Sequence, residues 1–182
     1  TVFNWLGQDL AGWRCLDAYA GSGALGFEAA SRGAAEVVLL ERDRVLARSL
    51  EQTRGRLAAQ VLRVETADAL AWMARCAPAR FELVFIDPPF DAQQFDAALK
   101  AAAPLVVPQG FVYHEADRAF GAEALAPFGL VPHRHLRAGH VPLVRVDGSL
   151  ERWNDMAAIS AASLEAISTR LLSPSHQAQL QT

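Results

Sequence analysis

Short apolar runs alternate along the chain with segments in which apolar residues recur at helical spacing. Phe81–Ile86 is apolar at every position but Glu82, which is typical of a central strand covered on both faces. The alternation predicts an α/β, Rossmann-like fold: a mostly parallel seven-stranded sheet with helices on both faces. Strands are expected over 13–18, 37–40, 61–64, Phe81–Ile86 and 111–115, with a closing pair over 130–137 and 141–147; helices are expected over 44–59, 69–75 and 94–103 and after the glycine-rich turn, ending near Gly33.

The two ends of the chain depart from this alternation. The first residues, Val2 to Leu6, have the pattern of a helix whose beginning is missing. After Gly148 the sequence changes to small residues and ends in a Gln-rich stretch. We therefore expect one domain over residues 1–147 and a helical or flexible tail over 148–182.

Composition limits the class of protein more than it limits the function. The chain has 182 residues, of which 52% are hydrophobic and 20% charged, as in a globular domain. No apolar run is long enough for a membrane span and nothing resembles a signal peptide, so we expect a cytoplasmic protein without membrane contact. Cys15 and Cys76 lack the spacing of metal ligands, and no metal is expected.

The net charge of −3 does not by itself suggest a nucleic-acid binder. Of the 17 basic residues, 16 are Arg and only Lys100 is Lys. Arginine suits planar recognition of phosphates and bases, but a GC-rich genome also encodes Arg in place of Lys. We give the genomic explanation the larger weight.

A glycine-rich segment follows the first predicted strand and leads into a helix. Gly21, Gly23 and Gly26 have the G-x-G-x-x-G spacing of a dinucleotide-binding loop, which by itself permits a nicotinamide cofactor. Asp17 discriminates, because a carboxylate before the loop would repel a pyrophosphate and attract the cationic amine and sulfonium of S-adenosylmethionine. The alternative that Asp17 only caps the loop or helix is about equally good for this residue alone. Cofactor contacts are predicted for Asp17, Ala20, Gly21, Ser22 and Gly23.

Two more carboxylates follow the next two predicted strands. Glu41 ends the second strand, where a carboxylate can accept hydrogen bonds from both ribose hydroxyls, and Arg42 follows it. Asp68 lies past the third strand, before Ala69, where it can contact the adenine amino group, cap a helix, or do both. Carboxylates at three successive strand ends favour a cofactor site that Glu41, Arg42, Asp68 and Ala69 complete.

The segment Asp87-Pro88-Pro89-Phe90 follows the fourth strand. The prolines make the turn rigid, and Pro88 restricts Asp87 to an extended conformation. An exocyclic amine of a base is a poor nucleophile, and Asp87 with a fixed carbonyl can accept its two N–H bonds and orient its lone pair. Phe90 offers a ring on which a base can stack. The alternative is a rigid turn with a buried Phe; the neighbouring glycine loop makes us prefer catalytic roles for Asp87, Pro88, Pro89 and Phe90.

The cysteines argue against methylation at a ring carbon of a pyrimidine, which usually needs a thiolate that adds to the base. Cys15 lies inside a strand and Cys76 follows a helix. Neither is placed for that chemistry, so amino-nitrogen methylation remains.

Several motifs together resemble a known family. They are Phe3-Asn4-Trp5-Leu6, the segment from Asp17 to Gly26, Glu28-Ala29 with the segment from Ser31 to Ala34, Glu41, and the segment from Val84 to Phe90. The combination is similar to the bacterial 16S rRNA guanine-N2 methyltransferases, which act on guanine 966, and the similarity runs from Thr1 to about Val146. Arg137-Ala138-Gly139 with Val141 resembles the closing hairpin of that family.

The resemblance implies a class I methyltransferase fold, S-adenosylmethionine as cofactor and methylation of a guanine in 16S rRNA. By motif position, the cofactor would be bound by Asp17, Gly21, Gly23, Glu41 and Asp68. The turn from Asp87 to Phe90 would hold the flipped-out guanine. The partner would be 16S rRNA or a small-subunit assembly intermediate, and a monomer is expected. Glu115 falls near the fifth strand end and is a weaker site candidate.

The sequence also departs from the family. An Arg-containing segment that precedes the Phe-Asn-Trp-Leu motif in family members is absent here, so poor activity on rRNA is one expectation. Thr53 stands where the family usually has Asn, and the tail after Gly148 does not match. Two alternatives stay open: an amino-methyltransferase for DNA adenine or protein glutamine, and a catalytically silent ribosome-assembly module.

Overall fold

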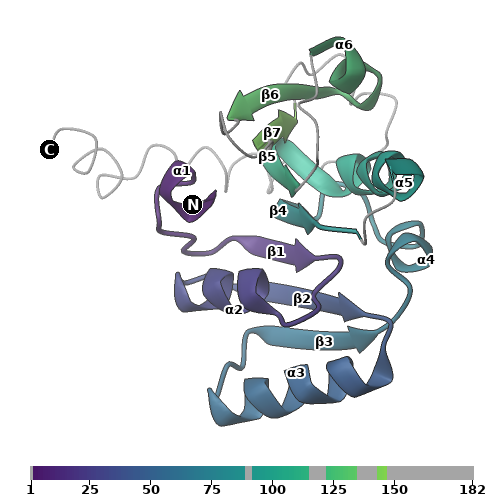
Figure 1. Ribbon diagram of the computed structural model, residues 1–182. Helices are drawn as coiled ribbons and strands as arrows, with labels where there is room; N and C mark the ends of the chain where they lie inside the picture. The colour runs from purple at the N-terminus through teal and green to yellow at the C-terminus, as the bar shows by residue number, and fades with distance from the viewer. Residues whose placement is uncertain (1, 89–91, 115–121, 135–142, 147–182) are drawn as a thin grey trace, which may run out of the picture. The chain divides into compact units, whose positions relative to one another are not determined.

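The computed structural model describes residues 2–88, 92–114, 122–134 and 143–146 (Figure 1). All of them belong to the first of two compact units, Thr1–Gly148. The second unit, Ser149–Thr182, lies outside the described residues, so the predicted boundary after residue 147 stays a prediction. None of the helices in the described part of the chain has the length and apolar character needed to cross a bilayer.

The described residues form one seven-stranded sheet in the order β3-β2-β1-β4-β5-β7-β6. The strands are β1 Arg14–Asp17, β2 Glu36–Glu41, β3 Leu62–Thr66, β4 Phe81–Ile86, β5 Val106–His114, β6 Leu130–Arg134 and β7 Leu143–Val146. The first five are parallel, and β7 is antiparallel to both β5 and β6. This confirms the predicted mostly parallel sheet and its closing pair.

Helices connect the parallel strands. They are α1 Val2–Trp5, α2 Ala24–Ser31, α3 Arg44–Arg56, α4 Ala69–Met73, α5 Ala92–Ala102 and α6 Ala122–Leu125, with 3₁₀ turns at Ala103–Leu105 and Ala126–Phe128. Right-handed crossovers from β1 toward β3, and from β3 back toward β5, place the helices on opposite faces of the sheet. The strand order therefore changes direction beside β1, and in open α/β sheets ligands bind at the carboxyl ends of the strands that flank such a point, here β1 and β4.

Two element boundaries differ from the predictions for identifiable reasons. The helix predicted over 44–59 ends at Arg56, and Ala58 adopts a positive φ of 49° that leaves the helix. The strand predicted from residue 111 begins at Val106, although Pro108 and Gly110 interrupt its apolar pattern. Its pairing with β4 shifts between Phe81 and Leu83, which absorbs the irregular residues.

The core is built on β4, whose six residues are all buried. The ring of Phe85 lies 6.0 Å from those of Phe3 and Tyr113, which links α1, β4 and β5. Trp13 stacks on Phe111 at the same centroid distance of 6.0 Å. The family motif residue Phe3 is thus a core residue.

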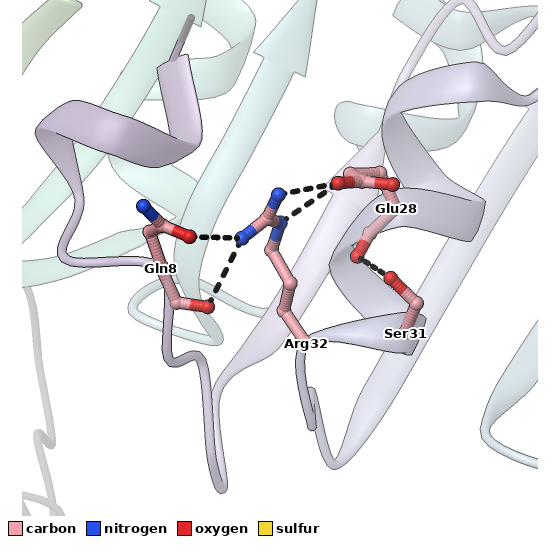
Figure 2. Close-up of polar contacts among 4 residues, drawn as sticks. All are labelled: Gln8, Glu28, Ser31 and Arg32. Carbon is pink, nitrogen blue, oxygen red and sulfur yellow. Dashed lines mark hydrogen bonds and ion pairs between the residues drawn. The ribbon is translucent and has the colours of Figure 1, made fainter.

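Arg32, just after α2, fastens the N-terminal segment to the domain (Figure 2). Its guanidinium donates to Glu28 on α2 and, at 3.4 and 3.3 Å, to the backbone and side-chain oxygens of Gln8. Its guanidinium carbon lies 4.8 Å from the centre of the Phe3 ring. These contacts hold α2, and so the glycine loop before it, against the N-terminal segment.

Candidate active site

Asp17 is the last residue of β1 and is only 4% exposed. Its Oδ2 accepts a hydrogen bond of 3.1 Å from the backbone N–H of Gly26, in the first turn of α2, and the N–H of Tyr19 also stabilises the carboxylate. Burial, helped by the nearby carboxylates of Asp87 and Glu41, outweighs these hydrogen bonds and raises the pKa of Asp17 from 3.8 to about 7. Asp17 therefore does cap the start of α2, as the alternative prediction held. Its buried carboxylate has no counter-ion among the described residues.

The three loop glycines do different work. A Cβ on Gly23 would lie 2.6 Å from Leu50 and 2.8 Å from Phe27, and one on Gly26 would collide with Leu39. Gly21 has a positive φ of 50°, but a Cβ there would meet nothing nearer than the backbone oxygen of Tyr19 at 4.0 Å. Gly23 thus lets the loop approach Leu50 of α3, and Gly26 lets α2 pack on β2, whereas Gly21 faces open space that a ligand can use.

Glu41, at the end of β2, holds the loop from the other side. One carboxylate oxygen accepts from the N–H of Gly21 at 3.0 Å and the other from the N–H of Asp43 at 2.8 Å. The loop is also tied to both neighbouring strands, because Ala18 N–H donates to Phe85 and Ala20 N–H to Leu40. Each oxygen of Glu41 keeps a lone pair with which to accept from a diol.

Asp68 caps α4 by accepting from the N–H of Ala71 at 2.9 Å, and Ala69 is buried behind it. Both Asp68 and Arg42 act electrostatically on Tyr19: burial raises the pKa of the Tyr19 phenol, Asp68 raises it further and Arg42 opposes the shift. The ends of β2 and β3 are thereby brought to the glycine loop. Tyr19 was not among the predicted site residues, although its place within the loop pointed to it.

Asp87 is exposed directly after β4, and Pro88 behind it is buried. Pro89 and Phe90 lie outside the described residues, as do Glu115 and the hairpin residues 137–141. Because β1 and β4 are parallel neighbours with Asp17 opposite Phe85, Asp87 lies one strand away from the glycine loop. Asp17, Glu41 and Asp87 therefore converge at one edge of the sheet.

His114 ends β5 opposite Ile86 and is fully buried. Its ring centre lies 4.6 Å from that of Phe95 on α5, and burial lowers its pKa to about 3, so the imidazole is neutral at neutral pH. Sequence analysis passed over this residue. Its only signal was a polar side chain at the end of an apolar strand, next to the strand that carries Asp87.

The cysteines take no part in this site. Cys15 is fully buried in β1, and burial together with the charges of Glu82 and Asp17 raises the pKa of its thiol, which stays protonated. Cys76 is half-buried in the loop before β4, at the amino end of that strand. Among the described residues no group of His, Cys, Asp and Glu side chains has the arrangement of a metal site.

A family profile described as Conserved hypothetical protein 95 matches residues 1–145. The chain belongs to this family. The predicted family resemblance is confirmed.

Two relatives carry the same name, ribosomal RNA small subunit methyltransferase D. The protein of Escherichia coli K12 is 42% identical over 90 residues, which cover 50% of this chain and 45% of the relative. That of Haemophilus influenzae is 35% identical over 128 residues, 65% of this chain and 64% of the relative. The chain thus spans about half to two thirds of the length of these relatives.

Solved structures agree on the fold. A conserved hypothetical protein of Streptococcus pyogenes is 29% identical with a TM-score of 0.69, covering 81% of this chain and 94% of that one. A Thermus thermophilus 16S rRNA N2 G1207 methyltransferase has a TM-score of 0.62 at 24% identity, covering 80% and 40%. The chain has the class I methyltransferase fold, as predicted.

Proposed function

We propose that this protein binds S-adenosylmethionine at the carboxyl ends of β1 to β3 and methylates the exocyclic N2 amine of a guanine in 16S rRNA. The observation that carries the proposal is Asp17, a buried carboxylate that lacks a counter-charge among the described residues and lies beside the open space at Gly21. A cationic ligand would supply that charge. The names of the Escherichia coli and Haemophilus influenzae relatives support the substrate class.

The three carboxylates suit this cofactor one by one. Asp17 would attract its cationic amino-acid part, the free lone pairs of Glu41 would accept its ribose hydroxyls, and Asp68 would accept from its adenine amino group. Ala20, Ser22 and Gly23 shape the loop around it, with Arg42 and Ala69 at its rim. When bound, the cofactor supplies an electrophilic methyl group.

Asp87 is the proposed catalytic residue. Its exposed carboxylate can accept an N–H of the guanine amine, which directs the nitrogen lone pair toward the methyl group. Pro88 fixes the backbone of Asp87, and in the proposal Pro89 and Phe90 complete the turn that holds the base. Transfer would then depend on positioning and on charge, since Asp87 would stabilise the N–H that becomes acidic as the amine gains the methyl group. Asp87 would then accept the proton that the product amine must lose and pass it to solvent.

The first test is methyl transfer from tritiated cofactor to naked small-subunit rRNA and to assembled subunits. Label in a guanine N2 of the rRNA is expected. Label that enters DNA or protein instead would refute the rRNA assignment, and cofactor binding without any transfer would favour a silent assembly module.

The second test is Asp87→Ala, which should reduce methyl transfer about 100- to 1,000-fold while cofactor affinity changes little, because the side chain acts on the amine. Asp87→Asn keeps one acceptor oxygen and should lose less. Glu123→Ala, which removes an exposed carboxylate of α6, is the matched control and should be as active as the wild type. Undiminished transfer in Asp87→Ala would refute the catalytic role.

A further inference from the structure

The outer face of α3 carries an unusual set of exposed side chains. Arg44, Val45, Arg48, Gln52 and Arg56 are all exposed and follow helical spacing, and Val45 is 73% exposed. The opposite side of the helix, with Ala47 and Leu50, is buried against the sheet. We call Arg44, Val45, Arg48, Gln52 and Arg56 the basic face of α3; Glu51 is exposed beside it.

The positive charge of the chain is concentrated around this helix. Residues 42–63 contain six arginines and two carboxylates, a net charge of +4. Because the whole chain carries −3, the remaining residues carry −7. The acidic overall charge therefore conceals a basic segment, and an Arg-rich genome does not explain why the excess falls on one element.

The stability of the helix does not explain the placement either. The first turn of α3 has no acidic residue, and Arg44 occupies it although the helix dipole disfavours a cation there. Arg44 and Arg48 also repel each other at i,i+4 spacing. Asp43 between Arg42 and Arg44 is used as the helix cap, accepting from Val45 and Leu46 at 2.7 and 3.0 Å.

The arginines of α3 differ in their partners. Arg54 forms an ion pair of 2.7 Å with Glu51, and Arg56 donates to Thr53 at 3.0 Å. Within the described part of the chain, no carboxylate forms an ion pair with Arg44 or Arg48. These two guanidinium groups are available to an anionic partner.

We propose that the basic face of α3 binds the phosphate backbone of the substrate RNA; the identity of that RNA rests on the proposed function. Guanidinium groups bind phosphate with paired N–H bonds, and α3 begins three residues after Glu41, at the site edge of the sheet. The carboxyl ends of β2 and β4 are two strand spacings apart, about 10 Å. Nucleotides flanking a base held at Asp87 span that distance.

The test compares the wild type with Arg44→Gln/Arg48→Gln in binding to a transcribed fragment of small-subunit rRNA, with S-adenosylhomocysteine present and no turnover. Fluorescence anisotropy over a range of salt concentrations should show roughly tenfold weaker binding at low salt. The slope of log K against log salt should fall by about 1.4–1.8, which corresponds to two lost phosphate contacts. Calorimetry with S-adenosylhomocysteine should show unchanged affinity, which also reports a folded site.

Arg75→Gln/Lys100→Gln is the matched control. Both residues are exposed and lie outside α3, so this variant makes the same change in net charge. It should bind RNA within about twofold of the wild type. Equal losses in both variants, or no loss in Arg44→Gln/Arg48→Gln, would overturn the proposal. So would a wild-type protein dimer that dissociates only in the α3 variant.

The two proposals fail in different ways. A wild type that binds RNA through α3 but methylates no small-subunit RNA would refute the proposed function and leave the basic face standing. A wild type that methylates rRNA, with an α3 variant that binds and methylates equally well, would refute the basic face alone.

Discussion

The neighbouring strands β1 and β4 bury one carboxylate at each end, and the two carboxylates are treated differently. At the amino end Glu82 accepts from the backbone N–H of Arg14 at 2.6 Å and from its guanidinium at 3.0 and 3.3 Å. At the carboxyl end Asp17 accepts from backbone N–H groups, and the charges closest to it are other carboxylates. Among the described residues, the carboxylate at the amino end has a cationic partner and the carboxylate at the other end has none.

The difference separates Glu82, a carboxylate that stabilises the fold, from Asp17, to which the proposed function assigns a ligand. A buried ion pair offsets its desolvation through its own counter-charge, as Arg14 does for Glu82. Asp17 has no such partner in the described residues, and its pKa of about 7 expresses the unfavourable energy of its charged form. A cationic ligand would relieve that energy, which is why the proposed cofactor site lies at the carboxyl end of β1 rather than at its amino end.

The largest expected effect comes from Asp17→Asn, which should weaken S-adenosylmethionine binding about 100-fold by removing a charge-assisted contact. The ligand-free variant should be at least as stable as the wild type at pH 8, because it no longer buries an ionised carboxylate. Calorimetry measures the affinity and urea unfolding the stability. Wild-type affinity in Asp17→Asn would show that the carboxylate serves only the loop.

A smaller effect is expected at the other end. Glu82→Gln should lower the free energy of unfolding by about 1–3 kcal/mol, since Arg14, whose side chain is 35% exposed, regains part of its solvation. Cofactor affinity should not change. The control Glu36→Gln breaks the Arg80–Glu36 pair, whose partners are 30% and 33% exposed, and should cost less than about 1 kcal/mol. A cofactor defect in Glu82→Gln would erase the distinction between the two ends.

The smallest expected effect is the pH dependence of cofactor binding. Because the pKa of Asp17 is raised to about 7, the carboxylate gains a proton as pH falls and no longer attracts a cation. Affinity for S-adenosylmethionine should fall about tenfold from pH 8 to pH 6, where one protonation blocks binding. The profile of Asp17→Asn, which corrects for titration of the ligand, should lack this component; identical profiles would assign the titration to another group.

Sequence patterns predicted elements best where burial is complete. The apolar run of β4 was located at its observed ends, because a strand covered on both faces has little choice of residues. β5 was placed five residues late, since Pro108 and Gly110 mask a strand whose irregular pairing is absorbed by its neighbour. The sequence located the candidate carboxylates because each follows a predicted strand, whereas it did not point to His114, whose position beside the strand that carries Asp87 depends on strand order.

The sequence by itself determined the alternation of strands and helices, the glycine loop, and the chemical character of each strand end. These are local properties, set by hydrophobic periodicity and by backbone requirements such as the positive φ of Gly21. Only the tertiary structure decided that Asp17 is buried with no cation beside it among the described residues while Glu82 has one, and that Arg44, Arg48 and Arg56 lie on one exposed face of α3. Burial and counter-charge are set by residues distant in sequence, so no local pattern encodes them.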